Sequence, residues 1–335
     1  MYANGRNASS PGKRRQRNDA SYTNDTNSDM EVRGSHMLRN PVRPVAIASI
    51  CGMAAPDTML DLVRQAAQAG PDLILLPENW QNLPEEPEDS AVIGELSAIA
   101  REHRVYILHA SQLRLNTGQK VNSALLLDRQ GDVASRYDKA YPYWSEFTDD
   151  PDTNTLPGDT PSVFATDFGM LGIAICFDVN FPHLWEAMDI AGAELVVWPS
   201  AYAAGTQLAA HALNHHYPIV SCTAEGSFHV FDLDGRTIRH TQNPHAHTEW
   251  ITLDLDRCIF HENFNDDKLR ALLDQPDCPV EVENHHREEQ WYVLRSRNGP
   301  SARETCARAG MEELRAYKHR SRIAIDAMRV GNTDG

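Results

Sequence analysis

Short apolar runs alternate with segments of helical periodicity along most of this chain, and this alternation constrains the fold more than any other feature. Between Asp57 and Gln68 the apolar residues recur at intervals of three and four, which is typical of one face of a helix. Short apolar runs between such segments indicate buried strands, so the pattern predicts an α/β fold. The expected strands are Val45–Ile50, Leu73–Leu76, Val105–Ala110, Ser123–Leu127, Leu195–Trp198, Ile219–Thr223 and Phe228–Phe231, and the expected helices are Asp57–Gln68, Ser90–His103, His183–Ala191 and Thr206–His216.

Three reactive side chains lie where such strands end. Glu78 follows the run Leu73–Leu76 and a proline, and Cys176 follows the run Gly172–Ile175. Lys139 follows a strand and its hairpin. Sites of open α/β sheets are built at strand ends. A carboxylate, an ammonium and a thiol there supply a base, an electrophilic group and a nucleophile, which is the set that acyl transfer through a thioester needs.

Each residue has a plainer interpretation when it is taken alone. A free cysteine is often an ordinary core residue, Glu78 could be a loop carboxylate, and Lys139 could be a surface lysine. Their joint occurrence in matching contexts favours a site. A Cys–His protease would pair Cys176 with a histidine such as His211, but no flanking pattern of such an enzyme is present. Nucleophile-elbow, phosphate-loop and dinucleotide-binding glycine motifs are absent as well.

The motifs resemble those of the nitrilase, or carbon–nitrogen hydrolase, superfamily. Three segments match its three motifs: Leu75-Leu76-Pro77-Glu78-Asn79, Arg136-Tyr137-Asp138-Lys139 and Gly172-Ile173-Ala174-Ile175-Cys176-Phe177-Asp178. The similarity runs over roughly residues 43 to 256 and includes Gly192–Ala201 and the turn Asp232–Gly235. It implies a four-layer α-β-β-α sandwich that needs no cofactor.

The resemblance also implies a role for each residue. Cys176 is the expected nucleophile and Glu78 the general base. Lys139, helped by the backbone N–H of Phe177, is expected to stabilise the oxyanion, and Glu146 matches a second glutamate that positions the lysine or the substrate. The function implied is an amidohydrolase that cleaves a non-peptide C–N bond of a small amide and releases ammonia or an amine. A nitrilase, an N-carbamoyl amidohydrolase and a catalytically silent binding protein of the same fold remain alternatives.

The expected substrate-binding side chains are Trp144, Phe177, Asn180, Trp198 and Tyr202, with core packing as the alternative for the aromatic ones. Asn180 stands where many amidase-type members have an arginine, and His183 where a glutamate is common. That arginine is thought to hold a substrate carboxylate in carbamoyl-amino-acid hydrolases and ω-amidases. Its absence predicts a substrate that is neutral near the scissile group.

Charge and hydropathy restrict the partners. The net charge of −16 argues against nucleic acid or an anionic membrane as the main partner. No apolar run approaches the roughly 20 residues of a membrane span, and the N-terminus has no apolar signal core. A cytoplasmic location with six reduced cysteines is therefore expected. The paired histidines, at 215–216, 245 and 247, and 285–286, lie in polar segments, and adjacent or alternate histidines rarely point at one ion without further ligands, so no metal is expected.

Both ends of the chain differ from its centre. Residues 1–40 are polar and are expected to be a disordered tail, and Gly34-Ser35-His36-Met37 resembles the remnant of an expression vector. The hydrolase domain is expected over residues 41–295. Residues 257–335 are polar, with Trp291–Leu294 as the only compact apolar patch, and 296–335 are expected to be a C-terminal tail with a helix from Glu312. That helix either lies at an interface of a homodimer or higher homo-oligomer, or packs on its own domain.

Overall fold

The computed structural model describes residues 42–147, 154–159, 163–297 and 299–331. The expected N-terminal tail lies outside these ranges. None of the helices in the described part of the chain is both long enough and apolar enough to cross a bilayer.

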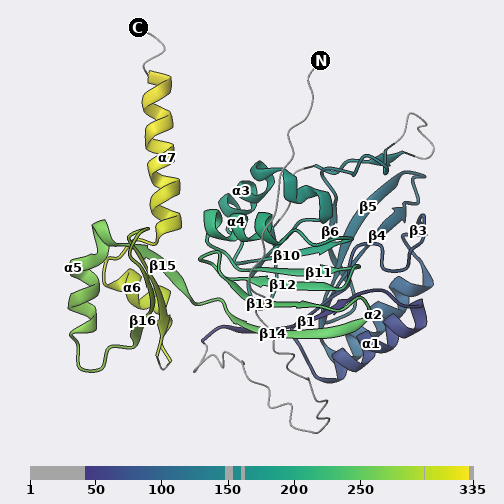
Figure 1. Cartoon of the computed structure of the whole chain (residues 1–335), viewed down its shortest axis with the longest axis horizontal. Coiled ribbons are helices and arrows are strands. Elements are labelled where there is room, and N and C mark those ends of the chain that lie inside the picture. Colours follow the sequence, from purple (N-terminus) through teal and green to yellow (C-terminus); the bar gives the residue numbers. More distant parts are fainter. Residues whose placement is uncertain (1–41, 148–153, 160–162, 298, 332–335) are drawn as a thin grey trace, which may run out of the picture. The chain divides into compact units, whose positions relative to one another are not determined.

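The larger of two main sheets is mixed (Figure 1). The strands β1, β2 and β4 run parallel, while β14, β5 and β6 are antiparallel to their neighbours. Its order is β14 (His247–Asp254), β1 (Pro44–Cys51), β2 (Leu73–Leu75), β4 (Tyr106–Arg114), β5 (Lys120–Leu127) and β6 (Val133–Asp138), with β3 (Glu86–Pro87) beside β4 and β7 (Thr155–Leu156) beside β5.

The second main sheet is also mixed, with β9, β10 and β11 parallel at its centre. Its order is β13 (Thr237–Gln242), β12 (Ser227–Phe231), β11 (Ile219–Thr223), β10 (Leu195–Ser200), β9 (Met170–Ile173) and β8 (Val163–Ala165). The helices of this part of the chain are α1 (Pro56–Gln68), α2 (Ala91–His103), α3 (Pro182–Ile190) and α4 (Gly205–His215).

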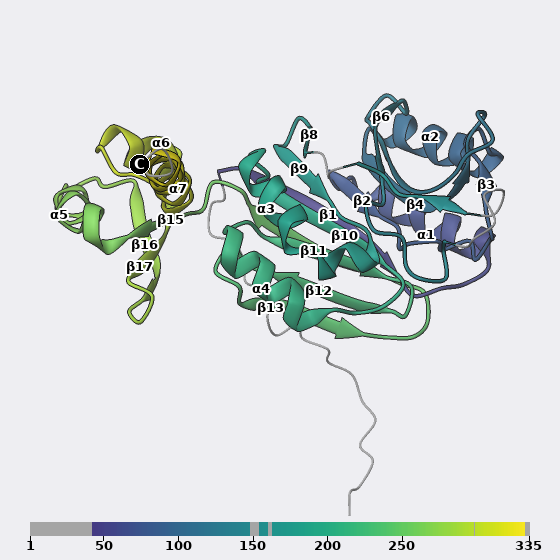
Figure 2. The ribbon, with the colours of Figure 1, turned by 90° about the horizontal axis from the view of Figure 1, so that it is seen from above.

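One apolar cluster joins the two sheets. Alternate residues of a strand point to opposite faces, so Leu73 and Leu75 of β2 enter this shared cluster while Ile74 packs with residues of α1 and α2. On β10, Leu195 and Val197 likewise enter the shared cluster. The other face of the second sheet packs against α3 and α4 (Figure 2). The α/β prediction is confirmed as a mixed fold with two main sheets.

The C-terminal residues form more structure than the sequence indicated. A third, antiparallel sheet has the order β15 (Cys258–His261), β17 (Trp291–Ser296) and β16 (Val280–His286), and α5 (Glu262–Leu273) and α6 (Ala302–Arg308) pack with it. The expectation of a single apolar patch is wrong, because the run Cys258–Phe260 and apolar residues of α5, α6 and β16 gather with those of β17 into buried clusters. The domain boundary expected at residue 296 falls on the last residue of β17.

The expected C-terminal helix is present as α7 (Leu314–Gly331). Its first turn packs on its own chain, because Leu314 and Tyr317 join a cluster with Ile259 and Val293. In the same turn, Arg315 donates to Asp189 of α3 at 2.7 Å. The beginning of α7 therefore packs on its own chain. The hypothesis of a homo-oligomer interface then applies to the second half of the helix, which is exposed.

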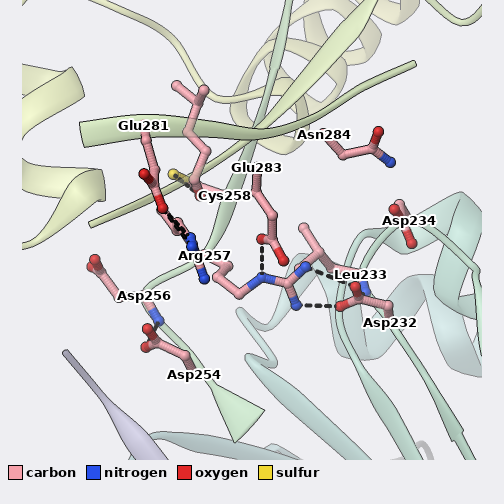
Figure 3. A network of polar contacts seen from close by, with 12 residues as sticks. Asp232, Leu233, Asp234, Asp254, Asp256, Arg257, Cys258, Glu281, Glu283 and Asn284 are labelled. Carbon is pink, nitrogen blue, oxygen red and sulfur yellow. Dashed lines mark hydrogen bonds and ion pairs between the residues drawn. The ribbon is translucent and has the colours of Figure 1, made fainter. Parts of the chain in front are cut away.

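A buried ionic network joins the β12–β13 turn to the C-terminal sheet (Figure 3). Both terminal nitrogens of Arg257 donate to the two oxygens of Asp232, at 2.5 and 2.7 Å, and its Nε donates to Glu283 at 2.6 Å. The side chains of Arg257 and Asp232 are 7% and 1% exposed. Burial opposes the charge of Arg257, but the two carboxylates outweigh it and raise the pKa of the guanidinium.

Replacing Asp232 by alanine should lower the free energy of unfolding by about 3–5 kcal/mol, because Arg257 would remain buried without its main counter-charge. Arg270→Ala is the control, since Arg270 also pairs with a carboxylate, that of Asp266, but its own side chain is 71% exposed; it should cost less than about 1 kcal/mol. Urea unfolding of both variants measures the difference. Equal, small losses would show that the network contributes little to stability.

Candidate active site

Glu78 is held by a buried loop directly after β2. The backbone N–H of Asn79 donates to the carbonyl of Ala110 on β4 at 2.9 Å, and Asn79 itself has a φ of 49°. Trp80 is fully buried, and its indole N–H donates to Nδ1 of His109 at 2.9 Å. These contacts fix the direction in which the Glu78 side chain leaves the sheet.

The ammonium of Lys139 lies between two carboxylates. Its Nζ donates to Oε1 of Glu78 at 2.8 Å and to Oε2 of Glu146 at 2.6 Å. Lys139 is 1% exposed and Glu78 is 6% exposed. The structure thus brings together the three charged residues that the sequence selected, from a loop after β2, the end of β6 and the turn beyond it.

Neutral donors complete this charged cluster. Nδ2 of Asn122 donates to Oε1 of Glu78 at 2.7 Å and to Oε1 of Glu146 at 2.6 Å. Gln112 donates to the same oxygen of Glu146, and the backbone N–H of Tyr143 donates to its other oxygen at 2.6 Å. The buried carboxylates therefore have several donors each, as buried anions require.

The charges stabilise one another. Burial opposes ionisation of Lys139, but the neighbouring carboxylates of Glu78 and Glu146 outweigh burial and raise its pKa. Burial would raise the pKa of Glu146, but the ammonium of Lys139 and the donors around it lower that pKa instead. Lys139 is therefore a permanent cation at neutral pH, and Glu146 a permanent anion.

Cys176 lies at a sharp turn after β9. It begins a short 3-10 helix, η1 (Cys176–Asn180), with a left-handed φ of 46°, which is uncommon for a residue with a Cβ and is found at functional sites. Asp178 holds this turn, because its carboxylate accepts the backbone N–H of Ile175 at 2.9 Å and the hydroxyl of Tyr137 at 2.7 Å. Burial raises the pKa of Asp178 to about 6.

The thiol of Cys176 is buried beside these charged groups. Burial raises its pKa to about 12, and the charge of Glu78 adds to the shift while Lys139 opposes it. The backbone N–H of Ala201, directly after β10, faces both partners: it hydrogen-bonds the sulfur of Cys176 and donates to Oε2 of Glu78 at 3.1 Å. The thiol and that carboxylate oxygen therefore meet at one amide.

Three of the expected substrate-binding residues surround this point. Phe177 follows the thiol, and its ring packs edge-on against that of Tyr143 with centroids 5.3 Å apart. Asn180 is exposed; its Nδ2 donates to the carbonyl of Phe177 at 3.1 Å and its Oδ1 accepts from Gln207 at 2.9 Å. Tyr202 is half-buried, and burial together with the nearby thiol raises its pKa.

The other two expected residues lie differently. Trp144 is 68% exposed and contacts the site through Tyr143, whose ring centroid lies 5.6 Å from that of Trp144. Trp198 is fully buried on the face of β10 that packs against α3 and α4. Strand alternation puts it on the opposite face from the shared core, but it still contacts the site: Nε1 donates to the carbonyl of Cys176 at 3.0 Å, and its ring packs edge-on against that of Tyr202 with centroids 5.7 Å apart.

Sequence reasoning assigned no role to several residues that the structure places here: Gln112, Asn122, Tyr137, Ser200 and Ala201. One signal was available. Gln112 and Asn122 are polar residues inside strands that otherwise read as apolar, and they face each other in the β4–β5 register.

The paired histidines have other partners. His215 lies 3.5 Å from Asp189, His247 3.6 Å from Glu249, and His286 2.9 Å from Asp234, while His285 pairs with Glu262. Within the residues that the structure describes, no group of three or more His, Cys, Asp or Glu side chains is arranged to hold a metal.

Relatives among well-described proteins are amidases. The chain is 28% identical over 179 residues to a deaminated glutathione amidase of Yersinia enterocolitica (47% of this chain, 62% of that protein), and 30% identical over 168 residues to the one of Bos taurus (44% and 51%). It is 28% identical over 155 residues to an omega-amidase of Xenopus tropicalis (42% and 55%). The matches therefore span only about half to three-fifths of these relatives.

Solved structures share the fold. An amidase from Nesterenkonia sp. superposes with a TM-score of 0.56 at 21% identity, over 71% of this chain and 98% of that one. A cysteine-to-alanine mutant of the Nesterenkonia sp. AN1 amidase in complex with butyramide gives a TM-score of 0.55 at 21% identity, over 66% and 94%. The model of the carbon-nitrogen hydrolase family matches residues 54–258, more than half of the 335 residues. This chain belongs to the carbon–nitrogen hydrolase family, the nitrilase superfamily.

Proposed function

We propose that this protein is an amidohydrolase that cleaves the C–N bond of a small amide through a thioester on Cys176. The observation that carries the proposal is the meeting of the Cys176 sulfur and Oε2 of Glu78 at the N–H of Ala201, with Lys139 beside them. A base, a nucleophile and a fixed cation are then within reach of one carbonyl group. The family's α-β-β-α sandwich, with the two main sheets as its inner layers, belongs to the same proposal.

Acylation begins with the thiol in its neutral form, because its pKa is about 12. As the sulfur bonds to the carbonyl carbon, its proton moves to Glu78, which acts as general base. The carbonyl oxygen becomes an oxyanion. Proton transfer neutralises Glu78 in the same step, so Lys139 is then left with one anionic neighbour, Glu146, and the new oxyanion.

Lys139 has a donor available for that oxyanion. An ammonium carries three N–H groups, and two of them are engaged by Glu78 and Glu146. The third N–H and the backbone N–H of Phe177 are the proposed oxyanion donors. Collapse of the intermediate breaks the C–N bond, and the proton on Glu78 passes to the leaving nitrogen.

Deacylation uses the same residues in reverse order. Water attacks the thioester carbonyl and gives a proton to Glu78, the C–S bond breaks, and the thiol takes the proton back. The result is one carboxylic acid and one molecule of ammonia or amine per amide, with the enzyme unchanged. The amidase names of the relatives at 28–30% identity support amide over nitrile as the substrate group.

Cys176→Ala should abolish amide hydrolysis, and Glu78→Gln should lower kcat on the order of 10²–10⁴-fold because the general base is lost. Ammonia release from simple amides, carbamoyl compounds and nitriles measures both effects and identifies the preferred class. Cys278→Ala is the matched control, a cysteine outside the site that should keep full activity. A Cys176→Ala protein with about a tenth of normal activity would refute the mechanism, and faster release from nitriles would favour a nitrilase.

Glu78→Gln should also lower the pKa of the Cys176 thiol below about 12, since it removes the negative charge that disfavours the thiolate and leaves Lys139 in place. Titration of the thiolate absorbance near 240 nm, with Cys176→Ala as the blank, measures the shift. An unchanged or higher thiol pKa in this variant would mean that Glu78 does not face the sulfur.

Neutral amides should be better substrates than their ω-carboxylate analogues. Where carboxylate-binding relatives are expected to have an arginine, this chain has Asn180, hydrogen-bonded to the neutral side chain of Gln207. A desolvated carboxylate without a cationic partner costs several kcal/mol, so the analogue should bind poorly. Steady-state kinetics on a matched pair decides the question: a higher kcat/KM for the carboxylate would overturn this prediction.

A further inference from the structure

The two oxygens of Glu78 are not equivalent. Oε1 accepts hydrogen bonds from Lys139 at 2.8 Å and from Asn122 at 2.7 Å, so both of its in-plane lone pairs are used. Oε2 accepts one hydrogen bond, from the N–H of Ala201 at 3.1 Å. Oε2 is also the oxygen that shares this amide with the sulfur of Cys176. Among the hydrogen bonds of the described residues, Oε2 is therefore the oxygen of Glu78 that keeps an available in-plane lone pair for the thiol proton.

The orientation of Asn122 follows from its neighbours. Its side chain is 1% exposed, and Nδ2 lies 2.7 Å from one carboxylate and 2.6 Å from another. A carboxylate can only accept, so the amide nitrogen must face both, and both of its hydrogens are committed. Asn122 and Lys139 together form a closed ring with Glu78 and Glu146, in which one bridge is neutral and the other charged.

From this geometry we infer that Asn122 is a positioning residue that selects the reactive oxygen of Glu78. By occupying the second lone pair of Oε1, its amide keeps that oxygen from taking the proton and leaves Oε2 to face the thiol. The same hydrogen bond stabilises the carboxylate in its buried position. The inference rests on the proposed role of Glu78 in amide hydrolysis.

Gln112 provides a matched comparison. It lies opposite Asn122 in the β4–β5 register, and it donates to Oε1 of Glu146 as Asn122 does. In the hydrogen bonds of the described residues, its amide nitrogen contacts Glu146 and not Glu78. Loss of either amide weakens the cluster around Glu146, but only loss of Asn122 changes the hydrogen bonding of Glu78.

The test compares Asn122→Leu with Gln112→Met, two replacements of similar shape without a donor. Asn122→Leu should lower kcat/KM for a neutral amide by about 10- to 100-fold, the effect of losing one hydrogen bond to a charged group. It should also move the acid limb of the pH profile upward by roughly one pH unit, because the ionised catalytic base loses a hydrogen-bond donor. Gln112→Met should leave the acid limb where it is in the unaltered protein.

The pH at which kcat/KM falls on the acid side does not depend on what fraction of a variant folds. Partial misfolding would therefore lower the activity without shifting the acid limb. The pH dependence of iodoacetamide modification of Cys176, with Cys176→Ala as the blank, gives a second measurement that needs no substrate. If amides prove not to be substrates, that measurement still tests Asn122. An unmoved limb in Asn122→Leu, or equal shifts in both variants, would overturn the inference.

Discussion

A buried ammonium held between two carboxylates is the interaction on which the rest of this site depends. Lys139 is almost fully buried, and an ion in that position is stable only when opposite charges and hydrogen bonds replace its hydration. Glu78 and Glu146 supply the charges. Two anions around one cation then leave an excess of negative charge, and the amides of Asn122 and Gln112 and the N–H of Tyr143 solvate it. The same excess keeps the nearby thiol protonated until a substrate arrives, since Glu78 and burial both disfavour the thiolate.

The two sheets are what bring these groups together. Glu78 and Lys139 follow strands of one sheet, whereas Cys176 and Ala201 follow strands of the other. One apolar cluster holds both sheets together, and its members include Leu75, Val197 and Cys176 itself. Packing within this cluster therefore helps to set the position of the nucleophile relative to the base. Loss of packing there should disturb catalysis as well as stability, since a site of this kind tolerates little displacement.

The sequence predicted the charged core of the site but not its neutral partners, for a physical reason. Glu78 and Cys176 follow apolar runs, and Lys139 follows a strand and its hairpin. A reactive group at the end of a strand can therefore be recognised from the order of residues along the chain. Asn122 and Gln112 lie inside strands, and they face each other because of the register between β4 and β5. That register cannot be determined from the sequence. Trp198 follows the core-packing alternative: alternation along β10 turns it to the helix-covered face, where it also packs against the ring of Tyr202. The C-terminal sheet escaped notice because polar residues flank its short apolar stretches, such as Cys258–Phe260.

Buried charge pairs and a small apolar cluster, in which Leu233 meets Ile259 and Val293, join that C-terminal sheet to the hydrolase fold. The bidentate pair of Arg257 and Asp232 is buried, with Glu283 as a second anion. Asp189 of α3 is paired with Arg315 of α7, and although burial opposes it, contacts with His215, Arg315 and His319 lower its pKa. A carboxyl whose pKa is lowered on folding contributes stability above its unfolded pKa and loses it as pH falls through the folded value. The attachment of α7 to α3 should therefore persist through the neutral range and weaken only in strong acid, in contrast to the turn at Cys176, where burial raises the pKa of Asp178 to about 6.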